Sequence, residues 1–267
     1  MKKIILYCLI LLTVLVGTLI LFQVINNKQN QRTLSDSNYT MGEKITFTTK
    51  DGVNIVGNYY SASSTKGIVL LHMMPATKES WVSFVTKLQS AGFKVLAIDL
   101  RGHGESIEYR VDDNIAMPQH LDYTKFSDAQ HQASIQDVES AVEFLKTKGV
   151  TEINLGGASI GANLSLQLGA EHTEIKKVIL LSPGFDYRGI KTENYSKALK
   201  PNQAVFFVSD ENDMRSYSGS AATMSQQLYN ITPAKKEIRI FKGAGHGTDI
   251  FAAHPELEDE LIQWLLK

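Results

Sequence analysis

Residues 153–169 read Ile-Asn-Leu-Gly-Gly-Ala-Ser-Ile-Gly-Ala-Asn-Leu-Ser-Leu-Gln-Leu-Gly, and this stretch decides the predicted fold. It opens with a short apolar run typical of a buried strand and continues into a leucine-rich run typical of a helix. Gly157 and Gly161 lie two residues before and two residues after Ser159. Such a tight turn leaves no room for a side chain at either glycine. The pattern therefore predicts a sharp strand-to-helix turn with an exposed serine hydroxyl at its apex.

Composition narrows the class of protein. The chain is 43% hydrophobic and 21% charged, which is ordinary for a globular protein. Its formal net charge is −1, so we expect no nucleic-acid partner. The only cysteine is Cys8, which excludes a disulfide within the chain.

The N-terminus forms a separate element. An apolar run over residues 4–25 follows Met1-Lys2-Lys3. A helix of this length spans about 33 Å, enough for a hydrocarbon core of about 30 Å. We therefore predict a signal anchor, a transmembrane helix over residues 1–25, with the rest of the chain outside the cytoplasm. A cleaved signal peptide is the alternative, although its apolar region is usually shorter and ends at small residues.

Residues 26–43 are polar and predict a linker. Residues 44–267 then alternate between two patterns. A hairpin is indicated by Asp51-Gly52 between two β-type runs, 44–49 and 54–61. Apolar strands are predicted at 67–72, 93–100, 152–155, 177–181, 204–208 and 237–241. Helices are predicted at 78–91, 126–148, 160–170, 221–228 and 255–267. We expect an α/β fold, a mostly parallel doubly wound sheet with helices on both faces.

The loops after parallel strands meet at one edge of such a sheet, where chemistry is expected. A nucleophilic Ser159 needs a base, and His246 follows the last predicted strand in a glycine-rich loop. We predict His246 as that base. Four other histidines are expected to be solvated on the surface, namely His120, His131, His172 and His254.

The base needs an acid, which should follow an intervening strand. Asp210, Glu211 and Asp213 all follow the strand predicted at 204–208. We predict Asp213, because its distance from the strand end allows a turn back toward His246. Asp210 remains the alternative.

Three further motifs join the serine turn in a resemblance. They are Ile98-Asp99-Leu100-Arg101-Gly102-His103-Gly104-Glu105-Ser106, Leu70-Leu71-His72-Met73-Met74-Pro75 and Gly243-Ala244-Gly245-His246. With these motifs in order, residues 44–267 resemble an α/β-hydrolase domain of the serine esterase or lipase type.

The resemblance implies the order Ser159, Asp213, His246 for a catalytic triad. It also implies an oxyanion hole formed by the backbone amides of Ile160 and Met74. His72 and His103 would support loops. Met73 departs from the family pattern, which usually has glycine there.

These features predict an enzyme that cleaves carboxylic esters through an acyl-enzyme, with no cofactor and no metal. The substrate would be a small molecule with a small or protruding acyl group, because only residues 182–203 are available as a flap. A serine peptidase or amidase on the same fold is the main alternative. A non-catalytic, membrane-tethered interaction protein is the other. The sequence leaves the oligomeric state open.

Overall fold

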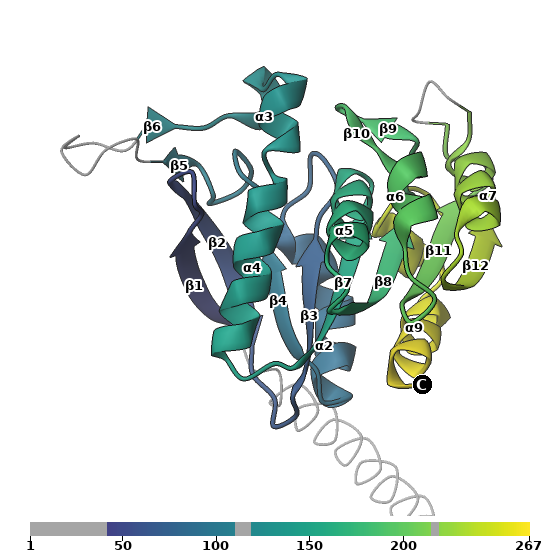
Figure 1. Cartoon of the computed structure of the whole chain (residues 1–267), viewed down its shortest axis with the longest axis horizontal. Helices are drawn as coiled ribbons and strands as arrows, with labels where there is room; N and C mark the ends of the chain where they lie inside the picture. The colour runs from purple at the N-terminus through teal and green to yellow at the C-terminus, as the bar shows by residue number, and fades with distance from the viewer. Residues whose placement is uncertain (1–41, 110–118, 215–218) are drawn as a thin grey trace, which may run out of the picture. The chain divides into compact units, whose positions relative to one another are not determined.

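A computed structural model describes residues 42–109, 119–214 and 219–267. Gly42–Lys267 form one compact unit, in which a twisted sheet lies between two layers of helices (Figure 1). In these three ranges no helix is both long and apolar enough to cross a membrane. The predicted signal anchor and nearly all of the predicted linker lie outside the described residues, so both stay predictions.

The sheet is mostly parallel, as the sequence predicts. Its strands lie in the order β12-β11-β8-β7-β3-β4-β2-β5-β6, and β1 pairs with β2. The parallel strands are β3 (Lys66–Leu71), β4 (Lys94–Ile98), β7 (Glu152–Ala158), β8 (Ile175–Leu181), β11 (Ala204–Asp210) and β12 (Lys235–Phe241). The antiparallel strands are β1 (Glu43–Thr48), β2 (Val53–Tyr60), β5 (Glu108–Tyr109) and β6 (Gln119–His120). The hairpin predicted around Asp51-Gly52 is confirmed, with Thr48 opposite Asn54.

Helices cover both faces of the sheet. One face carries α4 (Ile135–Thr147), α5 (Ile160–Glu171), α6 (Thr192–Ala198) and α7 (Ala221–Ile231), and Figure 1 shows these in front. The other face carries η1 (Lys78–Trp81), α2 (Val82–Ser90), α8 (Asp249–Ala253) and α9 (Glu256–Leu266). The remaining short helices are η2 (Tyr123–Lys125) and α3 (Asp128–Gln132).

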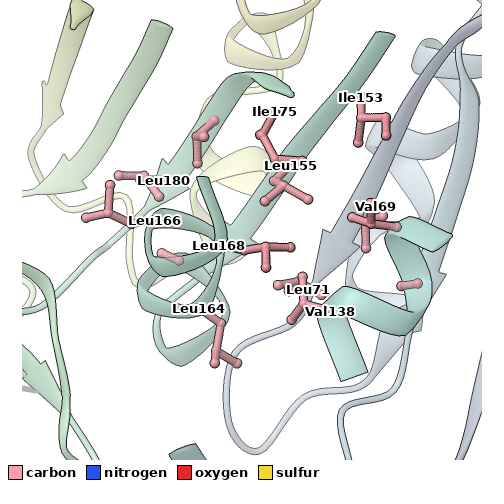
Figure 2. Packing of buried hydrophobic residues seen from close by; sticks show 14 of the residues in the cluster. Val69, Leu71, Val138, Ile153, Leu155, Leu164, Leu166, Leu168, Ile175 and Leu180 are labelled. Carbon is pink, nitrogen blue, oxygen red and sulfur yellow. The ribbon is translucent and has the colours of Figure 1, made fainter. Parts of the chain in front are cut away.

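Two apolar cores follow from the alternation of side chains along each strand. In β3, Val69 and Leu71 belong to the core under α4 and α5, whereas Ile68 and Leu70 belong to the core under α2 and α9. Figure 2 shows the first core, where Leu155 lies among side chains from neighbouring strands and from α5. Burial on both faces explains why these strands are continuous apolar runs.

The prediction of a single helix at 126–148 is wrong, because the structure has two helices there. The structure divides it into α3 and α4, and the amides of Ser134 and Asp137 bond to carbonyls three residues earlier. Hydrogen bonds over three residues make a tighter turn than those of an α-helix. At this turn Ser134 and Asp137 are buried, and the Asp137 carboxylate binds Arg101. No glycine or proline marks this break in the sequence.

The segment between β8 and β11 is small, as expected. It contains a separate two-stranded ribbon, β9 (Asp186–Tyr187) and β10 (Ile190–Lys191), followed by α6. The amide of Gln132 in α3 donates to the carbonyl of Arg188 between the two strands of the ribbon. In Figure 1 the ribbon and α3 both lie at the upper end of the sheet.

Candidate active site

Ser159 lies at the apex of the turn between β7 and α5, as predicted, but the residue is only 7% exposed, so the predicted exposure of its hydroxyl is wrong. Its backbone has φ 54° and ψ −117°, a conformation that side-chain-bearing residues rarely adopt. A Cβ atom on Gly157 would lie 2.1 Å from the Gly161 carbonyl oxygen, and one on Gly161 would lie 2.4 Å from the Leu71 oxygen. The prediction that neither glycine position has room for a side chain is therefore confirmed.

Asp213 and His246 meet at the same edge of the sheet. His246 Nδ1 lies 2.5 Å from Asp213 Oδ2, and the two side chains are buried. A carboxylate oxygen can only accept, so Nδ1 donates the proton in this bond. In the neutral ring, Nε2 is then a proton acceptor. Two loops bring the residues together. Asp213 lies in the turn that follows β11, which ends at Asp210, and His246 lies in the loop of residues 243–247 that follows β12.

The histidine loop, defined as residues 243–247, also packs against the serine turn. A Cβ atom on Gly247 would lie 3.1 Å from Cβ of Ala158, the residue before Ser159. Among the hydrogen bonds of the described residues, none joins the Ser159 hydroxyl to the His246 ring. Without substrate, hydrogen bonds of this kind are often long and shorten only in the reacting complex.

The backbone segments predicted to supply an oxyanion hole are adjacent. Ile160 is the first residue of α5, and the first amides of a helix have no partner within the helix. A Cβ atom on Gly161 would strike the carbonyls of Leu71 and His72, so the start of α5 lies against the segment that leads to Met74. The roles of Ile160 and Met74 as donors stay predictions.

Asp210, the alternative acid, bonds to backbone instead of to the ring. Its Oδ1 accepts from the amide of Asn212 at 2.7 Å, and its Oδ2 accepts from the amide of Ala244 at 2.6 Å. The geometry therefore favours Asp213 as the partner of His246. A hollow of about 290 Å³ adjoins the pair and is lined by Asp210, Asn212, Asp213, Met214, Gly243, Gly245 and His246.

The comparisons with known proteins agree with this fold. Residues 67–240 match the family described as alpha/beta hydrolase fold. The chain belongs to this alpha/beta hydrolase family.

Solved structures with the same fold are distant in sequence. An esterase of Pyrococcus furiosus is 20% identical with a TM-score of 0.66, over 84% of this chain and 89% of that one. A dienelactone hydrolase of Anabaena variabilis is 16% identical with a TM-score of 0.64, over 85% of this chain and 98% of that one. At these identities the likeness shows the fold alone.

Two curated relatives, the same protein from two strains of one species, match over a short stretch. Epoxide hydrolase B of Mycobacterium tuberculosis is 48% identical over 44 residues, which are 16% of this chain. The match spans only 12% of that relative's length, so its activity is not transferred to this alpha/beta hydrolase.

The structure shows what Met73, which departs from the family pattern, contacts. The Met73 side chain is buried, and its sulfur would lie 2.6 Å from a Cβ atom on Gly247. The thioether thus occupies space that a larger residue at 247 would need. Met73 packs against Gly247 of the histidine loop and belongs to the same apolar core as Ala158, the residue before Ser159.

His72 and His103 support loops, as the resemblance implies. His72 Nδ1 donates to the Met73 carbonyl at 2.9 Å, and Nε2 accepts from the Leu100 amide at 3.0 Å. Burial lowers the pKa of His72. His103 stacks on Tyr123, and burial together with the nearby His72 lowers the pKa of His103 to about 3.

The prediction that His131 is solvated is wrong. Its side chain is 2% exposed and packs edge-on against Phe126, and burial lowers its pKa. His131 is the buried residue of the short helix α3, whose inner face packs on Phe126. His120 is exposed, and His172 and His254 are partly exposed.

Sequence reasoning missed two buried groups near the site. Lys78 Nζ lies 2.8 Å from Asp99 Oδ2, and the Lys78 amide donates to the other Asp99 oxygen, which ties the segment after Met74 to the end of β4. Ser182 follows β8 with φ 51°, and its hydroxyl accepts from the Gly247 amide. Neither residue carries a signal in the sequence, because both contacts join distant segments.

A metal site was not predicted. In residues 42–109, 119–214 and 219–267, no group of three or more His, Cys, Asp and Glu side chains is placed to hold a metal ion. The expectation that no cofactor is used stays a prediction.

Proposed function

We propose that this alpha/beta hydrolase is a serine hydrolase that cleaves carboxylic esters with small or protruding acyl groups. The observation that carries the proposal is the placement of Ser159 on a strained turn beside a histidine loop whose ring is bonded to a buried carboxylate. A nucleophile, a base and an orienting acid are the parts that acyl transfer requires.

The reaction follows from these positions. Ser159 Oγ attacks the ester carbonyl while His246 Nε2 takes its proton. Asp213 fixes the ring through Nδ1 and stabilises the imidazolium that forms. The amides of Ile160 and Met74 donate to the developing oxyanion. His246 then protonates the leaving alcohol, and a water activated by His246 releases the acid from Ser159.

The substrate class rests on the small flap. The ribbon β9–β10 and α6 are the only secondary structure between β8 and β11 in the described residues. Met214, which follows Asp213, is 66% exposed and offers an adaptable apolar surface beside the pair. A flap of this size suits acyl groups that are small or that protrude from a larger molecule. The names of the two structural neighbours, an esterase and a dienelactone hydrolase, support the same class.

A peptidase or amidase would use the same three residues, and a non-catalytic interaction protein would need none of them.

We further propose that residues 4–25 anchor the chain in a membrane, with the hydrolase domain outside the cytoplasm. This second proposal rests on the length of the apolar run alone.

The direct test is a panel of p-nitrophenyl esters of increasing acyl length, assayed beside peptide p-nitroanilides. We expect ester turnover with highest kcat/KM for short acyl chains and little amide turnover. Faster hydrolysis of the anilides would replace the esterase proposal with a peptidase. Absence of turnover on every substrate, with the folded protein in hand, would favour the interaction protein.

A further inference from the structure

The histidine loop is held at two backbone amides, one on each side of His246. The Ala244 amide donates to Asp210 Oδ2 at 2.6 Å. The Gly247 amide donates to Ser182 Oγ at 3.0 Å. The two side chains that accept these bonds are buried, with exposed fractions of 1% for Asp210 and 0% for Ser182. Buried acceptors of this kind are costly to leave unpaired, so these bonds resist local opening.

Asp210 connects the two loops that meet in the site. Its second oxygen accepts from the Asn212 amide at 2.7 Å, inside the turn that leads to Asp213. One carboxylate therefore holds the acid turn and the histidine loop at the same time. Hydrogen bonds to an ionised acceptor are about twice as strong as neutral ones.

Ser182 reaches Gly247 from a strained backbone. Its φ of 51° is unusual for a residue with a side chain, and its amide donates to the Val208 carbonyl at 2.7 Å. Strain at a residue that is not glycine persists only where surrounding contacts fix it. In this conformation the hydroxyl accepts from the amide of the residue after His246, and the Met73 sulfur lies close to that same residue.

The loop itself provides little stiffness. Gly243, Gly245 and Gly247 all have positive φ, which these residues adopt without a steric penalty. The His246 ring, carried by this loop, therefore needs contacts from other segments to stay aligned with Asp213. We propose that Asp210 and Ser182 are positioning residues that align His246 with Asp213 and thereby set kcat. This inference rests on the proposed function, since it assigns a role to the same histidine.

The variants separate alignment from charge. Asp210→Ala removes both acceptors and a negative charge, whereas Asp210→Asn removes the charge and keeps one acceptor. Ser182→Ala removes an acceptor and changes no charge. Ser182→Gly removes the same acceptor and also relieves the positive φ, so it serves if the alanine variant folds poorly. Ser209→Ala is the matched control, because the Ser209 hydroxyl is equally buried and bonds to the Val208 carbonyl and to Ser225, without a bond to the histidine loop.

We expect Ser182→Ala and Asp210→Ala to lower kcat on a p-nitrophenyl ester about 10- to 100-fold, the range for a small misplacement of a catalytic group. KM should change less than about twofold, and Asp210→Asn should be intermediate. Ser209→Ala should match the wild type in kcat. The second readout is the proton NMR signal of the His246 Nδ1 proton, which should shift or broaden in Ser182→Ala and stay unchanged in Ser209→Ala.

An unchanged kcat and an unchanged Nδ1 signal in folded Ser182→Ala or Ser182→Gly would overturn the proposal. Equal losses of kcat in Ser182→Ala and Ser209→Ala would also overturn it, because they would indicate general loosening of the fold. The NMR readout does not depend on the reaction. If the ester is not a substrate, a shifted Nδ1 signal still supports the alignment role while the proposed function fails.

Discussion

At the scale of single residues, the distances around the serine turn decide which side chains are possible. The Gly161 carbonyl lies against Gly157, so the turn closes by direct backbone contact. The sequence could predict this, because glycines two residues before and after a serine, between a strand and a helix, are typical of such a turn. The Asp213–His246 pairing was predicted from the distance between Asp213 and the end of the preceding strand. The bonds of Asp210 and Ser182 to the histidine loop were not, since they depend on side-chain directions that no local pattern encodes.

The first prediction compares two neighbouring glycines. Gly157→Ala places a methyl group 2.1 Å from backbone, whereas Gly156→Ala places one 2.8 Å from the movable Leu70 side chain. We expect Gly157→Ala to prevent folding and Gly156→Ala to cost about 1–3 kcal/mol, the usual range for overpacking. Soluble yield and thermal unfolding measure both. A well-folded Gly157→Ala with wild-type stability would show that the turn has another geometry.

At the scale of secondary-structure elements, strongly patterned segments were predicted well. Residues 67–71 of β3 and 178–181 of β8 are continuous apolar runs because helices cover both faces of the sheet. The break between α3 and α4 was missed because its cause is tertiary, namely the inward Asp137 that binds Arg101. Burial raises the pKa of Asp137 to about 6 despite that partner. The two-residue strands β5 and β6 were missed because they are too short to show alternation.

The second prediction concerns the tie between η1 and β4. Burial alone would lower the pKa of Lys78, but hydrogen bonds to Asp99, Glu105 and Glu79 outweigh it, and the pKa is raised. Lys78→Ala would leave the fully buried Asp99 without its cation, and we expect a loss of about 3–5 kcal/mol in the free energy of unfolding.

Lys146→Ala is the control for this change. Lys146 pairs with Glu143 and Glu174 on the surface, and such pairs contribute about 0–1 kcal/mol. Urea unfolding of both variants gives the comparison. Similar small losses in both would show that the Lys78 pair contributes no more than a surface ion pair.

At the scale of the whole molecule, buried histidines make stability depend on pH. The pKa of His103 is lowered to about 3 in the folded chain, against about 6.5 when unfolded. Between these values the unfolded chain binds a proton that the folded chain does not. Stability contributed by His103 is therefore present above pH 6.5 and is lost as the pH falls toward 3.

The third prediction follows from this sign. His103→Gln should flatten the decline of unfolding free energy between pH 6 and pH 4 by about 1.4 kcal/mol per pH unit, the value for one proton. Urea titrations at pH 6, 5 and 4 measure it, with His120→Gln at an exposed position as control. Parallel declines in wild type and His103→Gln would contradict the assignment.

The fourth prediction concerns the N-terminal segment. A shortened chain that begins at Met41 should be soluble and keep full ester turnover, because every predicted site residue follows it. The full chain should stay in the membrane fraction after high salt and alkaline carbonate, and protease added to intact spheroplasts should digest the hydrolase domain. A soluble, processed full-length product would indicate a cleaved signal peptide. Protection from protease would reverse the proposed topology.

The central claim is that Ser159 is the nucleophile. The most direct measurement treats wild type and Ser159→Ala with a fluorophosphonate probe, locates the adduct by peptide mass spectrometry, and measures ester turnover in parallel. We predict one adduct, on Ser159, which is absent from a folded Ser159→Ala protein that has also lost ester turnover. An adduct on another residue, or a Ser159→Ala protein that is labelled and turns over ester like the wild type, would contradict the account.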